Sequence, residues 1–216
     1  MISAPSSNRR AVADLVAEIA EEYISELQRG YLAERSQAVA TLAQLRRGAG
    51  KLPEEVPELW GMAGTERLYA EQELSSRESE MAEAGLFLAV TLYALHQQSR
   101  PKQGMHRSGV ELGAAVRRLM PGGALDEPIR RRFVRVGTAG TRQALAYRLR
   151  EVIMLLRGQS IPLDYALLAQ QLYRAQLPDG MRQVRQRWGR SFHAYRPADQ
   201  PSDTSPVHPA SPEKDS

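Results

Sequence analysis

Arginine is the residue whose type and spacing suggest chemistry in this sequence, and it is concentrated between residues 126 and 157. A guanidinium group stays charged and can donate two parallel hydrogen bonds to one phosphate group. The arginines of this stretch are Arg130, Arg131, Arg132, Arg135, Arg142, Arg148, Arg150 and Arg157. Its acidic residues are Asp126, Glu127 and Glu151, so we expect most of the arginines to be unpaired. The stretch therefore predicts a surface that binds a polyanion.

Two helices must position these arginines. Apolar residues recur at helical spacing on both sides of a Gly-Thr-Ala-Gly junction at residues 137–140, which predicts two amphipathic helices that meet there. We expect the apolar faces to consist of Ile129, Phe133 and Val136 in the first helix and Leu145, Leu149, Val152, Ile153 and Leu156 in the second. The arginines would then occupy the outer faces of a helical scaffold.

The charge of the chain is segregated along its length. Residues 1–99 carry 9 basic and 15 acidic side chains, a net charge of −6. Residues 100–196 carry 19 basic and 6 acidic side chains, a net charge of +13, and the remainder has a net charge of −3. A basic half of this kind indicates a polyanionic partner.

Helical periodicity continues along the rest of the chain, and we find no strand pattern. It predicts a buried central helix marked by Met81, Leu86, Leu88, Val90, Leu92 and Leu95, and a last helix in which Met181, Val184, Trp188 and Phe192 face inward. We therefore predict an all-α fold with two packed helical-bundle subdomains, residues 1–99 and 100–196, separated by a basic loop at residues 99–107. Residues 197–216 are rich in Pro and Ser and lack periodic apolar residues, which predicts a disordered tail.

Several local features give sharper expectations. Gly30 should end the first helix, and Trp60 should plug one end of a bundle with its large apolar ring. Ser108 should cap the next helix together with Glu111, and Pro162 should open a later helix.

Most catalytic chemistry lacks the residues it would need. The chain has no cysteine, its four histidines show no metal-ligand spacing, and it has no phosphate-binding glycine loop or acid–base pair. We therefore expect no metal, no cofactor and no enzymatic activity. The N-terminus lacks a signal-peptide pattern, and the longest apolar run, residues 84–95, is shorter than the roughly 20 residues that span a membrane. A cytoplasmic protein without a membrane partner fits best.

An ordered series of short motifs resembles one known family. The motifs are LRR at residues 45–47, Trp60, ALHQQ at 94–98, MH at 105–106, GVELG at 109–113, RRRF at 130–133, LREVI at 149–153, IPLDY at 161–165, Val184 and Trp188. Their order and spacing resemble the CasB family, the small subunit of the type I-E CRISPR surveillance complex Cascade. The resemblance extends from about Thr41 to Tyr195.

The resemblance implies a non-catalytic, all-helical subunit that binds other Cascade subunits and guide RNA, target DNA strands and a second copy of itself. It would steady the heteroduplex of guide and target and guide the displaced strand of the R-loop. Basic positions of the family match Arg46, Arg47, Arg130, Arg131, Arg142 and Arg150. Arg132 and Arg135 have no counterpart and depend on local charge alone.

Two other functions remain open at this point. Residues 129–156 could form a helix-turn-helix of a transcription factor, with Thr141, Arg142 and Gln143 contacting base edges. Alternatively, the basic half could dock on an acidic protein, as an adaptor without nucleic-acid contact.

Overall fold

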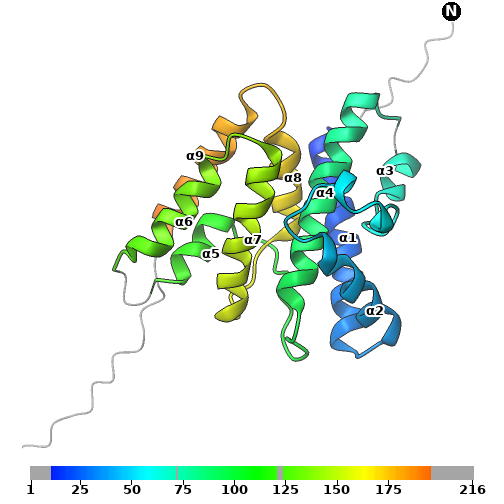
Figure 1. Cartoon of the computed structure of the whole chain (residues 1–216), viewed down its shortest axis with the longest axis horizontal. Helices are drawn as coiled ribbons and strands as arrows, with labels where there is room; N and C mark the ends of the chain where they lie inside the picture. The colour runs from blue at the N-terminus through cyan, green and yellow to red at the C-terminus, as the bar shows by residue number, and fades with distance from the viewer. Residues whose placement is uncertain (1–10, 72, 121–123, 196–216) are drawn as a thin grey trace, which may run out of the picture.

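The computed structural model describes residues 11–71, 73–120 and 124–195, and this part of the chain is built from helices (Figure 1). Its only strand-like feature in these ranges is an isolated bridge between His106 and Leu163. The all-α prediction is therefore confirmed. The helices are α1 (Val12–Leu32), α2 (Ser36–Leu45), α3 (Glu66–Glu71), α4 (Ser76–Gln97), α5 (Leu112–Arg118), α6 (Glu127–Gly137), α7 (Arg142–Gly158), α8 (Tyr165–Arg174) and α9 (Gly180–Ala194), with short 3-10 turns η1 (Arg46–Gly48), η2 (Pro53–Glu55) and η3 (Pro57–Leu59).

Helix α4 is the centre of the fold because it is apolar on nearly every side. It packs against α1, α2, α7 and α8, and its residues from Gly85 to Gln97 are buried. A Cβ atom on Gly85 would lie 3.1 Å from the backbone nitrogen of Tyr173, so the absence of a side chain allows α4 and α8 to approach closely. The sequence predicted this buried central helix correctly.

The arginine-rich helices form a layer outside this centre. Helix α7 lies against α4, α6 lies against α7, and α5 packs against α9 (Figure 1). The predicted break between the two helices is confirmed: α6 ends at Gly137, the first residue of the Gly-Thr-Ala-Gly junction, and α7 begins at Arg142. The Asp126 side chain caps α6 and the Thr141 hydroxyl caps α7. On α9, Val184, Trp188 and Phe192 face the interior at helical spacing, as expected.

The two halves of the chain share one hydrophobic core. Helix α8 packs against α1 and α4, and buried apolar residues from both sides of residue 100 belong to the same cluster. The division into subdomains at residue 100 stays a prediction. The predicted disorder of residues 197–216 falls outside the described residues.

Polar side chains connect the helices where α1, α4 and α8 meet, and all but Gln28 are buried. We call this group the polar junction, and it consists of Gln28, His96, Gln97, His106, Asp164 and Tyr165. The Gln97 amide closes the turn after α4, since it accepts from the Met105 N–H at 2.8 Å and donates to the carbonyls of Arg100 and Gln103. The Asp164 carboxylate accepts from the N–H groups of Gly109 at 2.7 Å and Leu167 at 2.8 Å. His96 Nδ1 lies 2.8 Å from the Tyr165 hydroxyl.

Two expectations about the N-terminal half are wrong. Gly30 does not end α1 but lies inside it, where a Cβ atom would come within 2.6 Å of the Ala38 Cβ; the glycine permits close packing against α2. The indole of Trp60 is not a plug: it is 68% exposed and donates to the Pro53 carbonyl, which closes the surface turn formed by η2 and η3.

Two predicted helix starts are also wrong. Ser108 lies in a turn, and α5 begins at Leu112 with Glu111 as its N-cap and no side-chain cap. Pro162 precedes α8 rather than opening it, because Leu163 pairs with the chain at residues 105–107 and Asp164 caps the helix. In both places, tertiary pairing between the two segments overrides the local capping signal.

Candidate nucleic-acid interface

Three of the six predicted arginines lie on two segments that approach each other at Gly50. Arg46 and Arg47 form the first two positions of η1, and Gly50 lies two residues beyond its end. The Arg150 side chain from α7 packs over Gly50, since a Cβ atom there would lie 2.7 Å from the Arg150 Cδ. Gly50 also has a φ of 82°, a backbone conformation that residues with a side chain rarely adopt. A glycine thus lets the stem of Arg150 lie against the chain just after η1; we call Arg46, Arg47 and Arg150 the η1–α7 cluster.

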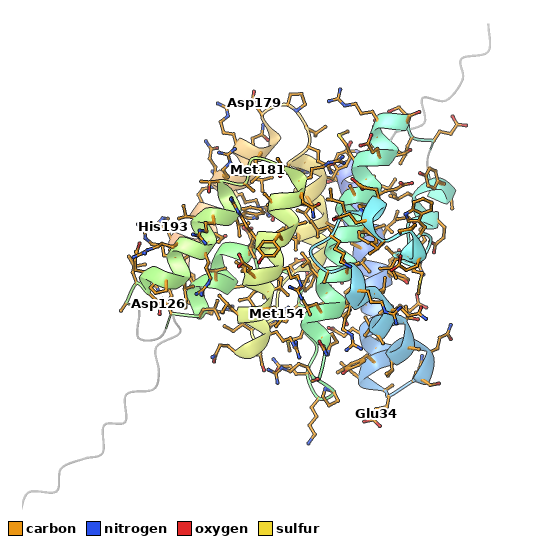
Figure 2. All side chains as sticks on the ribbon, in the orientation of Figure 1. Glu34, Asp126, Met154, Asp179, Met181 and His193 are labelled. Carbon is orange, nitrogen blue, oxygen red and sulfur yellow. The ribbon has the colours of Figure 1, made fainter. Side chains whose placement is uncertain are left out.

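The cluster is accessible and has no acidic partner in the described part of the chain. Arg47 and Arg150 are exposed and Arg46 is partly exposed, and none of the three forms an ion pair there. Two large exposed side chains flank Arg150 on α7: Tyr147, 56% exposed, and Met154, 42% exposed and labelled in Figure 2. This surface therefore offers free guanidinium groups beside an aromatic ring.

The arginines at the start of α6 are less free than the sequence suggested. Arg130 and Arg131 both bond to the Glu127 carboxylate, at 3.1 Å and 3.3 Å. The expectation that they lack acidic partners is wrong. The signal was present in the sequence, because residues three and four apart lie side by side on a helix.

Arg142 is also paired, and its acid comes from the other half of the chain. Its guanidinium lies 3.3 Å from a carboxylate oxygen of Glu80, on α4. This pairing was not visible in the sequence, since the two residues are far apart along the chain.

Several remaining arginines of this stretch connect helices. Arg148 donates at 2.6 Å to the carbonyl of Arg135, near the end of α6, where a cation is favourable. Arg157 donates to the Gln98 carbonyl, and the Arg157 carbonyl accepts from Arg100, so this pair ties the ends of α4 and α7 together. Arg132 and Arg135, predicted from local charge alone, are exposed on α6.

The six predicted residues therefore occupy three places: the η1–α7 cluster, the first turn of α6, and the first turn of α7. Helix α6 begins near Asp126, at the left edge of the view in Figure 2, whereas Met154 on α7 lies near the centre. Whether a bound strand connects these places into one track stays a prediction.

The helix-turn-helix alternative conflicts with the first turn of α7. Its three proposed base-edge contacts are all engaged within the chain: the Thr141 hydroxyl caps α7, Arg142 pairs with Glu80, and Gln143 donates to Glu55 at 3.1 Å. In a recognition helix, all three side chains would have to exchange these partners for base edges in the major groove. No observation in the structure favours this function.

One cluster with metal-ligating residue types was missed in the sequence. Ligand atoms of Glu21, His106 and Asp164 lie within 4.8 Å of one another. However, His106 Nδ1 accepts from the Tyr165 N–H, so Nε2 carries the proton and donates to Glu21 at 3.0 Å. Both carboxylate oxygens of Asp164 accept backbone hydrogen bonds as well. The cluster is better explained as a group of hydrogen bonds that connects α1 to the start of α8.

Membrane insertion has no support in the helices. Within the described residues, no helix combines the length and the apolarity that crossing a bilayer requires.

Comparison with known proteins gives two matches of high coverage. The family model of the CRISPR-associated protein Cse2 matches residues 41–193. The crystal structure of CasB from Thermobifida fusca is 50% identical in sequence, with a TM-score of 0.74, and the match covers 85% of this chain and 98% of that chain. No curated protein sequence matches.

The family model and the CasB structure agree with the resemblance drawn from the ordered motifs. The members of this family are structural, generally non-catalytic components of a CRISPR defence complex. The chain belongs to the Cse2/CasB family, the small subunits of the type I-E Cascade complex.

Proposed function

We propose that this Cascade subunit binds nucleic-acid backbone and thereby stabilises both the target heteroduplex and the displaced strand of the R-loop. The observation that carries the proposal is the η1–α7 cluster, in which three arginines remain accessible and unpaired within the described chain. Exposed guanidinium groups without acids bind phosphate without first breaking an ion pair.

Sequence specificity does not have to come from this subunit. In RNA-guided complexes, base pairing with the guide selects the target, and protein subunits contact the backbone. The η1–α7 cluster contains arginines but no Asn or Gln in a base-reading arrangement, which suits contact with phosphate rather than with base edges. Tyr147 adds one exposed ring on which a base of a single strand could stack.

The proposed partners are the other Cascade subunits with their guide RNA, both target DNA strands, and a second copy of this chain, in the cytoplasm. The adaptor function, in which the basic surface docks only on an acidic protein, makes the opposite prediction for DNA. Binding to DNA therefore separates the two.

The first test is the salt dependence of binding by the full chain to single- and double-stranded oligonucleotides of unrelated sequence. Weak binding without sequence preference is expected, with log K falling by roughly 0.7 to 0.9 per phosphate contact per log unit of salt. Tight, salt-insensitive binding to one duplex sequence would contradict the proposal. Absence of binding at low salt, together with normal assembly into the complex, would favour the adaptor function.

A further inference from the structure

A cavity of about 570 Å³ lies beside the first turn of α7 and is distinct from the η1–α7 cluster. It is enclosed by the N-terminal half of α4, the connection between α6 and α7, the end of α8 and the start of α9. These segments all lie at the upper end of the molecule in Figure 1. The volume falls within the roughly 300–1,000 Å³ of small-molecule sites.

The buried part of the cavity lining is apolar. It includes Met81 and Leu88 on α4 and Leu172 on α8, and the partly buried Met181 on α9 adjoins them in the lining. A thioether is flexible and makes favourable contacts with the edges of aromatic rings. The wall is therefore suited to a flat, aromatic ligand.

The charged side chains of the lining are exposed and mostly cationic, so we take them as the mouth of the cavity. They are Arg77, Arg142 and Arg185, with one acid, Glu80. The N-terminus of α7, a helix of 17 residues, is also part of the lining, and its dipole favours an anion there. An anionic group at the mouth and an aromatic group inside together describe a nucleotide.

We propose that this cavity holds one nucleotide of a single DNA strand, with its base against the methionines and its phosphate on Arg77, Arg142 and Arg185. The inference rests on the proposed function, because it assigns a binding site for the strand to which the subunit binds. An unpaired base can enter such a pocket at a lower cost than a base in a duplex.

A partner's peptide is the competing occupant, and the lining argues against it. Bidentate guanidinium groups match phosphate geometry, and the net positive charge of residues 100–196 already indicates a polyanion. Thr141 and Gln176 add polar groups to the lining.

Glu80 competes with the nucleotide for Arg142. The pair is 3.3 Å apart, and both side chains are about half exposed or more, at 45% and 68%. Because exposed ion pairs contribute little to stability, a phosphate can displace the carboxylate. This gives the site a test in which one variant should bind more tightly.

The first experiment is photo-cross-linking of the full chain to oligothymidylate that carries a single 5-iododeoxyuridine, followed by mass spectrometry. Cross-links to Met81 or Met181 are expected, since both methionines line the cavity and Met81 is buried there. Met154, exposed on the outer face of α7, is the internal reference for surface binding.

The second experiment fills the cavity with Ala84→Phe, a change in the lining of α4. It should weaken oligothymidylate binding by at least about fivefold, as expected when contact with one base is lost. Ala40→Phe adds the same ring to an exposed position of α2 and should change nothing. Glu80→Gln should tighten binding by about two- to fivefold by releasing Arg142, whereas Glu58→Gln, equal in charge, should not.

Oligothymidylate binding with cross-links confined to Met154, and unchanged by Ala84→Phe and Glu80→Gln, would overturn the cavity assignment while leaving the proposed function intact. If Ala84→Phe instead bound oligothymidylate normally but failed to enter the complex, the cavity would belong to a partner's polypeptide, and the assignment would again fail. Absence of any oligonucleotide binding by the wild-type chain would overturn both proposals.

Discussion

The polar junction and the η1–α7 cluster use polar side chains in opposite ways. In the junction, Gln97, His106 and Asp164 are buried and each makes at least two hydrogen bonds. In the cluster, Arg47 and Arg150 are exposed, and neither forms an ion pair in the described ranges. This difference indicates that polar groups with hydrogen-bond partners inside the chain maintain the fold, whereas charged groups without such partners are available to a ligand. Changes in the two regions should therefore separate stability from binding.

The largest expected effect is on binding, from reversing the η1–α7 cluster with Arg46→Glu, Arg47→Glu and Arg150→Glu together. Release of target DNA from the assembled complex should become about 10³-fold faster, because each charged hydrogen bond contributes roughly 1.5 kcal/mol. The free energy of unfolding should change by only about 0.5 kcal/mol per site, as is usual for surface positions.

The matched control reverses Arg29, Arg107 and Arg190, which are also exposed and give the same change in net charge. It should leave DNA release nearly unchanged, with incorporation of both variants checked in the purified complex. Equal release rates for the two triple variants would remove the η1–α7 cluster from the mechanism.

The next largest effect is on stability, from Asp164→Ala in the polar junction. The variant leaves the N–H groups of Gly109 and Leu167 without their acceptor and removes the α8 cap, for a loss of about 3 kcal/mol in denaturant unfolding. Asp164→Asn keeps one carbonyl oxygen for the cap and should lose about half as much. Salt-dependent DNA binding of the folded variants should match that of the wild type; a parallel loss of binding would break the separation between the two regions.

A smaller effect concerns pH. Burial lowers the pKa of His96 from 6.5 to about 3, with carbonyls of Leu156 and Ile161 opposing the shift. The unfolded chain binds the proton more readily, so the contribution of neutral His96 is complete above pH 6.5 and is lost as pH falls toward 3. At pH 5 the loss should reach about 2 kcal/mol in the free energy of unfolding. His96→Gln should reduce the pH slope in this window, and an unchanged slope would show that another group causes it.

The sequence predicted well those elements whose apolar residues recur at helical spacing. The α6 and α7 boundaries, the buried α4 and the inward face of α9 all follow from side-chain spacing, which packing reinforces. The errors occurred at Gly30, Trp60, Ser108 and Pro162, where a contact with a distant segment decides the outcome. Local signals cannot report that Ala38 approaches Gly30, or that Leu163 pairs with residues 105–107.

The candidate site could likewise be predicted only in part. Basic clustering indicated which helices carry arginines, but not which of those arginines are free. Glu127 was within reach by helical spacing, whereas Glu80 and the cavity beside it depend on how α4, α7 and α9 meet. Arg77 and Arg185, which line the cavity, could not be singled out from the sequence, because neither lies in a basic cluster with family counterparts.

The smallest expected effect comes from the arginines at the start of α6. They are exposed, like the η1–α7 cluster, but they have partners, like the polar junction. Arg130→Glu with Arg131→Glu should speed release of target DNA by about tenfold or less, since Glu127 already competes for both guanidinium groups. Guide RNA loading should change less if other subunits hold the guide. The fold should persist, because both positions are exposed and surface changes usually cost within roughly 0.5 kcal/mol. Glu127→Gln frees both arginines and should slow release by a few-fold at most. If reversal left release unchanged and Glu127→Gln did too, the α6 arginines would belong with the structural groups, and the η1–α7 cluster would stand alone as the candidate backbone contact on this surface.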